Sequence, residues 1–122
     1  MTVRDYECDM QGIVNNAVYQ NYMEHARHGF LLSKGLSFEE LTSRGVIVVV
    51  IRAELDYKQP LRSGDSFLVS VAARQISRLK LVFDQQIRKQ PAGELMLEAQ
   101  ITATSLNERN RPYFPEELKA LL

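Results

Sequence analysis

A single long helical pattern, followed by strand patterns over most of the remaining chain, constrains the fold more than any other feature. Residues 17–33 carry apolar side chains at three- and four-residue intervals, which predicts a helix with one apolar face. A helix of this kind is stable when a sheet covers its apolar face. We therefore expect an α+β fold in which a sheet curls around the helix. The residues expected on the other faces of the helix are Gln20, Glu24, Arg27 and His28.

The strand patterns occupy almost everything after Gly45. Their alternation and apolar content predict long antiparallel strands, joined by short turns such as "PLRSGD" at residues 60–65. The start of the chain predicts one further, short strand over residues 3–8. The four long segments are 46–57, 66–77, 79–89 and 95–106.

Turn and capping residues mark the ends of the helical segments. Gly12 predicts a turn, Asn16 is a favourable N-cap for the long helix, and Gly35 is a favourable residue for its end. A second, shorter helix is expected over residues 37–44, with Ser37 as its cap.

Length, charge and cysteine usage narrow the class of protein. A chain of 122 residues with 45% apolar and 25% charged residues fits one globular domain, residues 1–122. Its longest apolar run, residues 46–51, is too short to span a membrane. Fifteen basic and fifteen acidic residues cancel, which argues against nucleic-acid binding. A lone cysteine, Cys8, cannot form an internal disulfide, and we expect a cytoplasmic protein.

The stretch "DMQGIVNNAVY", residues 9–19, places a carboxylate just ahead of the long helix. An acid in this position is often only a cap or turn residue. A helix start, however, also offers unpaired backbone N–H groups and a favourable dipole for a developing negative charge. Asp9 followed by Asn15 and Asn16 is therefore a candidate catalytic constellation.

The wider segment "YECDMQGIVNNAVYQNYMEHARHGFL", residues 6–31, resembles the signature of the hot-dog-fold acyl thioesterases of the 4-hydroxybenzoyl-CoA thioesterase family. With residues 60–65 and "NERNRP" at 107–112, the similarity is closest to the branch of plant acyl-lipid and methylketone-synthase thioesterases. The resemblance implies a five-stranded antiparallel sheet wrapped around a long central helix. It also implies a homodimer or homotetramer with active sites at the dimer interface.

The resemblance further implies hydrolysis of an acyl-CoA or acyl-carrier-protein thioester to a free acid and a thiol. Asp9 corresponds to the catalytic carboxylate of the family, acting as nucleophile or as general base toward water. We expect the backbone amide of Asn16 to polarise the thioester carbonyl. The side chain of Asn15 is a candidate for orienting water, and Glu24 lies where many relatives carry an acid.

The acyl pocket and the carrier site follow from the same resemblance. Arg78 and Lys80 lie near a strand junction where relatives bind the nucleotide of coenzyme A, and they would equally suit the phosphopantetheine of a carrier protein. The acyl chain is expected beside the helix, against the partner subunit and branched residues such as 46–51. The residues expected to line the pocket are Gly12, Val14, Tyr19 and Tyr22.

Two other functions remain open at this point. A 3-hydroxyacyl-thioester dehydratase would need a histidine near the helix start, where this chain has Asn15 and Asn16. A non-catalytic acyl-thioester binding protein would keep the pocket without needing the acid. We expect no cofactor and no metal, because His25 and His28 lack the spacing of a helical zinc site. The sequence leaves open the acyl group, the carrier, the oligomeric state and whether the N-terminus is complete.

Overall fold

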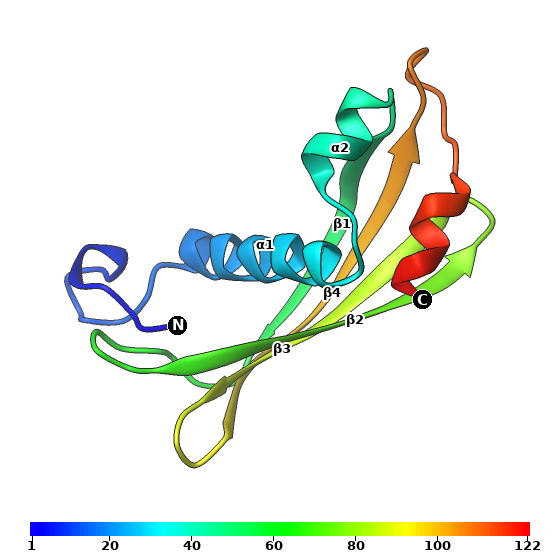
Figure 1. Ribbon diagram of the computed structural model, residues 1–122. Helices are drawn as coiled ribbons and strands as arrows, with labels where there is room; N and C mark the ends of the chain where they lie inside the picture. The colour runs from blue at the N-terminus through cyan, green and yellow to red at the C-terminus, as the bar shows by residue number, and fades with distance from the viewer.

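The computed structural model describes all 122 residues and contains one long helix, one short helix and four strands. Figure 1 shows the elements in space. In chain order they are η1 (Asp5–Glu7), α1 (Asn16–Ser33), α2 (Phe38–Ser43), β1 (Ile47–Tyr57), β2 (Phe67–Ser77), β3 (Lys80–Lys89), β4 (Glu94–Leu106) and η2 (Glu116–Leu121).

The four strands form one antiparallel sheet in the order β1-β4-β3-β2. The sheet twists strongly, and α1 lies along one side of it while α2 lies over β1 (Figure 1). The strand bounds confirm the four long strands predicted from the sequence. Strands β1 and β2 are the two edges of the sheet. The outer side of β1 is unpaired by this chain, whereas the first residue of β2, Phe67, exchanges two hydrogen bonds with Met1.

The hydrophobic core lies between α1 and the sheet. Met23 and Leu31 of α1 are fully buried, and the Phe30 ring packs edge-on against Phe83 of β3 with centroids 6.5 Å apart. Burying a side chain of this size stabilises the fold by roughly 1.5–3 kcal/mol. The apolar face of the helix is therefore where its periodicity predicts. Arg27 is different: expected on another face, it is only 9% exposed.

The expected fifth strand is wrong, because residues 3–8 do not join the sheet. The Glu7 N–H donates to Arg4 O (3.0 Å) and the Cys8 N–H donates to Asp5 O (3.1 Å), which closes the 3₁₀ turn η1. The Arg4 N–H also donates to the Glu7 carboxylate (2.8 Å). Val3 is buried at the start of the segment, but Tyr6 is 76% exposed, so no alternating buried face continues along it to hold it as a strand.

Strand β1 is an irregular edge. Its register with β4 passes from Val50 opposite Ala103 to Arg52 opposite Thr102, so Ile51 is an extra residue, as in a β-bulge. Val50 and Ile51 remain 50% and 48% exposed. This edge therefore presents both apolar side chains and unpaired backbone groups to the surroundings. Neither helix has the combination of length and hydropathy needed to cross a bilayer.

Candidate active site

Asp9 begins a short loop that leads directly into α1. An antiparallel bridge between Cys8 and Val14 closes the loop. Inside it, the Asp9 N–H donates to Ile13 O (2.9 Å) and the Gly12 N–H donates to Asp9 O (3.0 Å). Gly12 has φ +79°, a conformation that L-residues with a side chain rarely adopt. The glycine turn predicted from the sequence is thus what closes the loop.

The Asp9 carboxylate is held by its own loop. Its Oδ1 accepts from the Gln11 N–H (2.8 Å) and, at a longer distance, from the Ile13 N–H (3.4 Å). Its Oδ2 accepts no hydrogen bond from the chain, and the residue is exposed. One oxygen thus fixes the orientation of the carboxylate, while the other is available as a nucleophile or as a proton acceptor.

The segment after β1 supports this loop. The Val14 N–H donates to Leu61 O (2.9 Å), and the Leu61 N–H donates to the phenol oxygen of Tyr19 (2.9 Å). Ile13 forms a bridge with Arg62. The "PLRSGD" turn therefore positions the Asp9 loop against the first turns of α1. Burial is the largest cause that raises the pKa of Tyr19 above its ordinary value, and the bond from Leu61 partly opposes it.

The first residue of α1 carries a free backbone donor. The N-cap is Asn15 rather than the expected Asn16, and its side chain makes no capping hydrogen bond. The Asn15 N–H donates to Glu7 O (3.0 Å), and its carbonyl accepts from the Val18 N–H (3.0 Å). The Asn16 N–H has no acceptor within the chain. It lies at the positive end of an 18-residue helix, where an anion is favoured.

A cavity of about 300 Å³ opens beside this helix start. Val14, Asn16 and Tyr19 line it together with Tyr57 at the end of β1. Gly12 is exposed outside it, and Tyr22 lines a different cavity. Val14 and Tyr19, two of the four residues expected in the pocket, thus line the same cavity as Asn16.

Tyr22 is tied to the 3₁₀ turn instead. Its hydroxyl donates to the Glu7 carboxylate (2.8 Å), and its side chain is 7% exposed. Burial raises the pKa of Tyr22, and the bond to Glu7 raises it further, because both disfavour the phenolate. Tyr22 therefore anchors η1 to the helix within a single chain.

Glu24 and the basic pair lie away from Asp9 within one chain. Glu24 is exposed on the middle of α1, with its carboxylate 3.8 Å from Nε2 of His28. Arg78 and Lys80 are exposed at the β2–β3 turn, which lies at the opposite end of the sheet from the start of α1 (Figure 1). Within one chain, Arg78 and Lys80 therefore do not share a site with Asp9.

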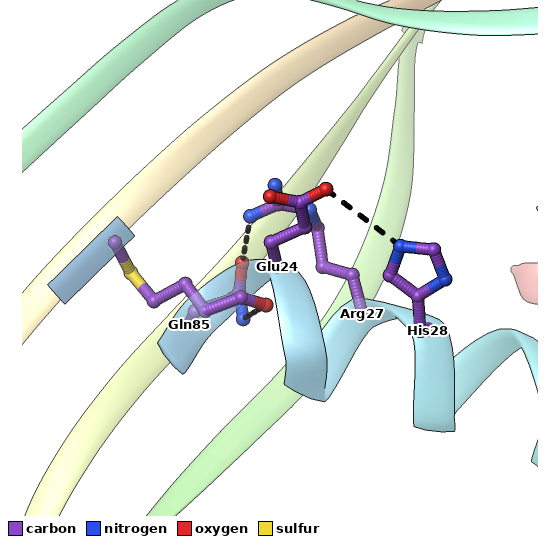
Figure 2. A network of polar contacts seen from close by, with 5 residues as sticks. Glu24, Arg27, His28 and Gln85 are labelled. Atoms are coloured by element: carbon purple, nitrogen blue, oxygen red, sulfur yellow. Dashed lines mark hydrogen bonds and ion pairs between the residues drawn. The ribbon is translucent and has the colours of Figure 1, made fainter. Parts of the chain in front are cut away.

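The structure also contains a buried polar pair that the sequence analysis missed. Nη1 of Arg27 donates to Oε1 of Gln85 (2.9 Å), and Nε2 of Gln85 donates to the carbonyl of Met23 (3.1 Å). Figure 2 shows this arrangement, with the Glu24–His28 contact beside it. Burial lowers the pKa of Arg27, and the Glu24 carboxylate partly opposes this. The sequence contained one sign of this pair, which is that Gln85 is a polar residue at a core-facing position of an otherwise apolar strand.

A second cavity, of about 250 Å³, opens next to this pair. Arg27, Glu24 and His28 of α1 line it, with apolar side chains such as Phe38 and Val48. It has no residue in common with the cavity beside Asn16. No group of three or more His, Cys, Asp or Glu residues is arranged to hold a metal ion.

Comparison with known families identifies the fold. The profile described as the thioesterase-like superfamily matches residues 3–122. The chain belongs to this superfamily. Its architecture is that of the hot-dog thioesterases, with four strands around the helix. A 1,4-dihydroxy-2-naphthoyl-CoA thioesterase from Synechocystis has the same fold, with a TM-score of 0.90 at 23% identity over 99% of this chain and 91% of that one.

Curated relatives carry names of the same kind. An acyl-acyl carrier protein thioesterase of Arabidopsis thaliana, the chloroplastic ATL3, is 41% identical over 112 residues, which is 92% of this chain and 59% of the relative. The chain therefore spans about three fifths of that protein. The long-chain acyl-CoA thioesterase FadM of Escherichia coli is 29% identical over 100 residues, 82% of this chain and 75% of FadM.

Proposed function

We propose that the chain is a single thioesterase domain that hydrolyses an acyl-CoA or acyl-carrier-protein thioester to a free acid and a thiol. The observation that carries the proposal is the short loop in which Asp9 keeps one carboxylate oxygen free, directly before the free amide of Asn16. A base or nucleophile and an oxyanion donor are the two groups that thioester cleavage requires.

The proposed reaction uses only these groups and water. In the general-base route, Asp9 takes a proton from water, and the water oxygen attacks the carbonyl carbon. The resulting oxyanion accepts from the Asn16 N–H, the C–S bond breaks, and the thiolate leaves and takes up a proton. In the nucleophilic route, Oδ2 attacks the carbonyl carbon first, the C–S bond breaks, and the thiolate leaves and takes up a proton. Water then hydrolyses the mixed anhydride that has formed. The exposed Asn15 amide makes no capping bond and is free to orient the water.

Assembly would complete the site. The open β1 edge, with its exposed apolar residues, supports the expected homodimer or homotetramer. Arg78 and Lys80 lie at the far end of the sheet within one chain. We therefore propose that they bind the carrier's phosphate groups at a site completed by a neighbouring copy, where Glu24 can also approach the substrate.

The test is thiol release from a panel of acyl-CoAs and acyl carrier proteins, for the wild type and Asp9→Asn. The asparagine keeps an oxygen that accepts from Gln11 but removes the charge. We expect activity to fall by ~10²-fold or more. Glu39→Gln is the matched control, an exposed acid on α2 that should change little.

Each outcome of this experiment is informative. Equal turnover by the wild type and Asp9→Asn would contradict the role of Asp9. Binding without turnover in both would favour a non-catalytic acyl-thioester binding protein. Single-turnover hydrolysis in ¹⁸O-labelled water tests the nucleophilic route, because water that opens the mixed anhydride at the Asp9 carboxyl carbon leaves label on Asp9, whereas the general-base route places label only in the product acid.

A further inference from the structure

The phenol of Tyr19 is a buried hydrogen-bond donor with no acceptor in the chain. Its oxygen accepts from the Leu61 N–H (2.9 Å), and Tyr19 is only 3% exposed. A phenol oxygen can accept a hydrogen bond and also donate one. The bond from Leu61 is the only one that the Tyr19 hydroxyl makes, so its own proton is unpaired. Buried donors in folded proteins are normally paired, so this proton calls for an acceptor from outside the chain.

Helix geometry directs the Tyr19 hydroxyl toward the start of α1. In an α-helix the Cα–Cβ bond tilts toward the N-terminus, so a long side chain lies over the preceding turn. Tyr19 comes three residues after Asn16, the first residue of the helix. The contacts agree, because Leu61 binds the phenol through its N–H and accepts from the Val14 N–H through its carbonyl (2.9 Å). The hydroxyl is therefore held beside the segment that leads into Asn16.

The unpaired hydroxyl and the free amide belong to one cavity. Tyr19 and Asn16 both line the cavity of about 300 Å³ beside the helix start. Tyr57 lines it too, with its ring edge-on to that of Tyr19 and the centroids 5.5 Å apart. The arrangement needs only one chain, because both donors come from neighbouring turns of the same helix. Two donors without acceptors at one cavity suit an oxygen atom that becomes negative during a reaction.

The bond from Leu61 also prepares the phenol to donate. An oxygen that accepts a hydrogen bond polarises its own O–H, so consecutive hydrogen bonds strengthen one another. The bond fixes the phenol in place, and a fixed donor needs no reorganisation while the charge develops. Burial raises the pKa of Tyr19, so the proton stays on the oxygen at neutral pH.

We propose that the Tyr19 hydroxyl is a second donor to the thioester carbonyl oxygen, beside the Asn16 N–H. When water or Asp9 adds to the carbonyl carbon, this oxygen becomes an oxyanion and accepts from both donors. The proton stays on the phenol throughout, so the balance of atoms and charge in either route is unchanged. The assignment rests on the proposed thioesterase function and gives Tyr19 a catalytic role in place of pocket lining alone.

The test compares two unreactive CoA analogues of equal chain length. One is a fluoroketone, whose carbonyl carbon becomes tetrahedral by adding water, and the other is a thioether without an oxygen at that position. Tyr19→Phe keeps the ring and should weaken fluoroketone binding by roughly tenfold or more, with thioether binding unchanged. It should also lower kcat by ~10²-fold with little change in KM. Tyr113→Phe, at an exposed tyrosine, should alter none of these values.

A second variant separates donation from folding, because Tyr19→Phe also removes the acceptor of the Leu61 N–H. Incorporation of 3,5-difluorotyrosine in place of Tyr19 keeps the ring, the oxygen and this bond, while fluorine lowers the pKa of the phenol. Only a protonated phenol donates, so tight binding of the fluoroketone should be lost at a lower pH than in the wild type. The surrounding titratable side chains are the same in both proteins: Cys8, Tyr22, Tyr57, Lys58 and Asp65.

The outcomes distinguish this proposal from the thioesterase proposal. If an active wild type and Tyr19→Phe have equal kcat and equal affinity for the fluoroketone, the role of Tyr19 is overturned and the roles of Asp9 and Asn16 stand. If no thioester is cleaved, a loss of affinity for the fluoroketone alone in Tyr19→Phe still supports the donor. Equal weakening of both analogues, with no shift in pH dependence after fluorination, would show that Tyr19 acts only through packing.

Discussion

The two polar sites along α1 are built in opposite ways. Near the helix start, Asp9 is exposed, and its side chain is held by Gln11 and Ile13 of the same loop. Near the middle of the helix, Arg27 is buried and is held by Gln85, 58 positions further along the chain. The first site is local and exposed to water, and the second is long-range and mostly buried.

This difference indicates two kinds of chemical work. A solvated carboxylate keeps its charge at little cost to stability and can exchange protons with water. A buried guanidinium carries a desolvation cost, which the hydrogen bond to Gln85 offsets in part. Turnover is therefore expected to depend on the first site, and stability on the second.

The largest expected effect separates turnover from stability at the Asp9 site. Asp9→Asn should lower kcat/KM by ~10²-fold or more. The free energy of unfolding should change by no more than about 0.5 kcal/mol, because the residue is exposed and the asparagine oxygen still accepts from the loop. Urea denaturation beside the activity assay checks both values. A loss of several kcal/mol would mean that Asp9 has a structural role.

At the buried Arg27–Gln85 pair, we expect a substitution to lower stability and to change activity little. Gln85→Leu removes the only acceptor that Arg27 has in the chain and leaves the charge unpaired, so unfolding free energy should fall by about 1–3 kcal/mol. Gln75→Leu, at an exposed position of β2, is the matched control. Hydrolysis of an unsubstituted acyl-CoA should change much less than in Asp9→Asn. Unchanged stability in Gln85→Leu would show that the pair is not stabilising.

The same contrast explains what the sequence could predict. The helix, the four long strands and the glycine turn are encoded in patterns a few residues long, and so is the Asp9 loop. Arg27 was expected on a polar face because helical periodicity considers only the helix itself. Its burial depends on β3, which supplies Gln85. No pattern within α1 contains that partner, so such a pair is visible only once the strands are placed.

For residues 3–8 the sequence prediction fails for a different reason, because local hydrogen bonds decide the structure. Their apolar and aromatic content predicts a strand, but local hydrogen bonds to the carbonyls of Arg4 and Asp5 close a 3₁₀ turn, and Tyr6 is exposed to solvent. Strand propensity describes a half-buried surface, and only Val3 of this segment is buried. The sheet is therefore one strand smaller than the resemblance implies.

Glycine substitutions test whether the Asp9 loop acts through its geometry. Gly12 and Gly93 have nearly the same φ (+79° and +81°), and a Cβ at either would meet no atom within 4 Å. Alanine at either position should therefore cost about 1 kcal/mol of stability through backbone strain alone. Only Gly12→Ala should also lower kcat/KM, since it displaces Asp9. Equal activity in the two variants would show that the loop tolerates a change of conformation.

The smallest expected effect concerns Tyr22, which lies between the two sites and combines their traits. Its phenol is buried like Arg27, but its partner Glu7 lies close to Asp9 in the chain. Burial and the bond to Glu7 raise the pKa of Tyr22 in the folded protein. The unfolded tyrosine ionises near pH ~10, so the folded state binds more protons above that pH and its stability falls as pH rises further.

Tyr22→Phe should flatten this part of the stability curve, while Tyr113→Phe, at an exposed tyrosine, should leave its slope unchanged. Urea midpoints measured between pH 8 and about pH 11, on either side of the ordinary tyrosine pKa, make the comparison. If stability falls with pH equally in the wild type and in Tyr22→Phe, another group causes the loss of stability at alkaline pH. Burial also raises the pKa of Tyr19, which would then be the next residue to substitute.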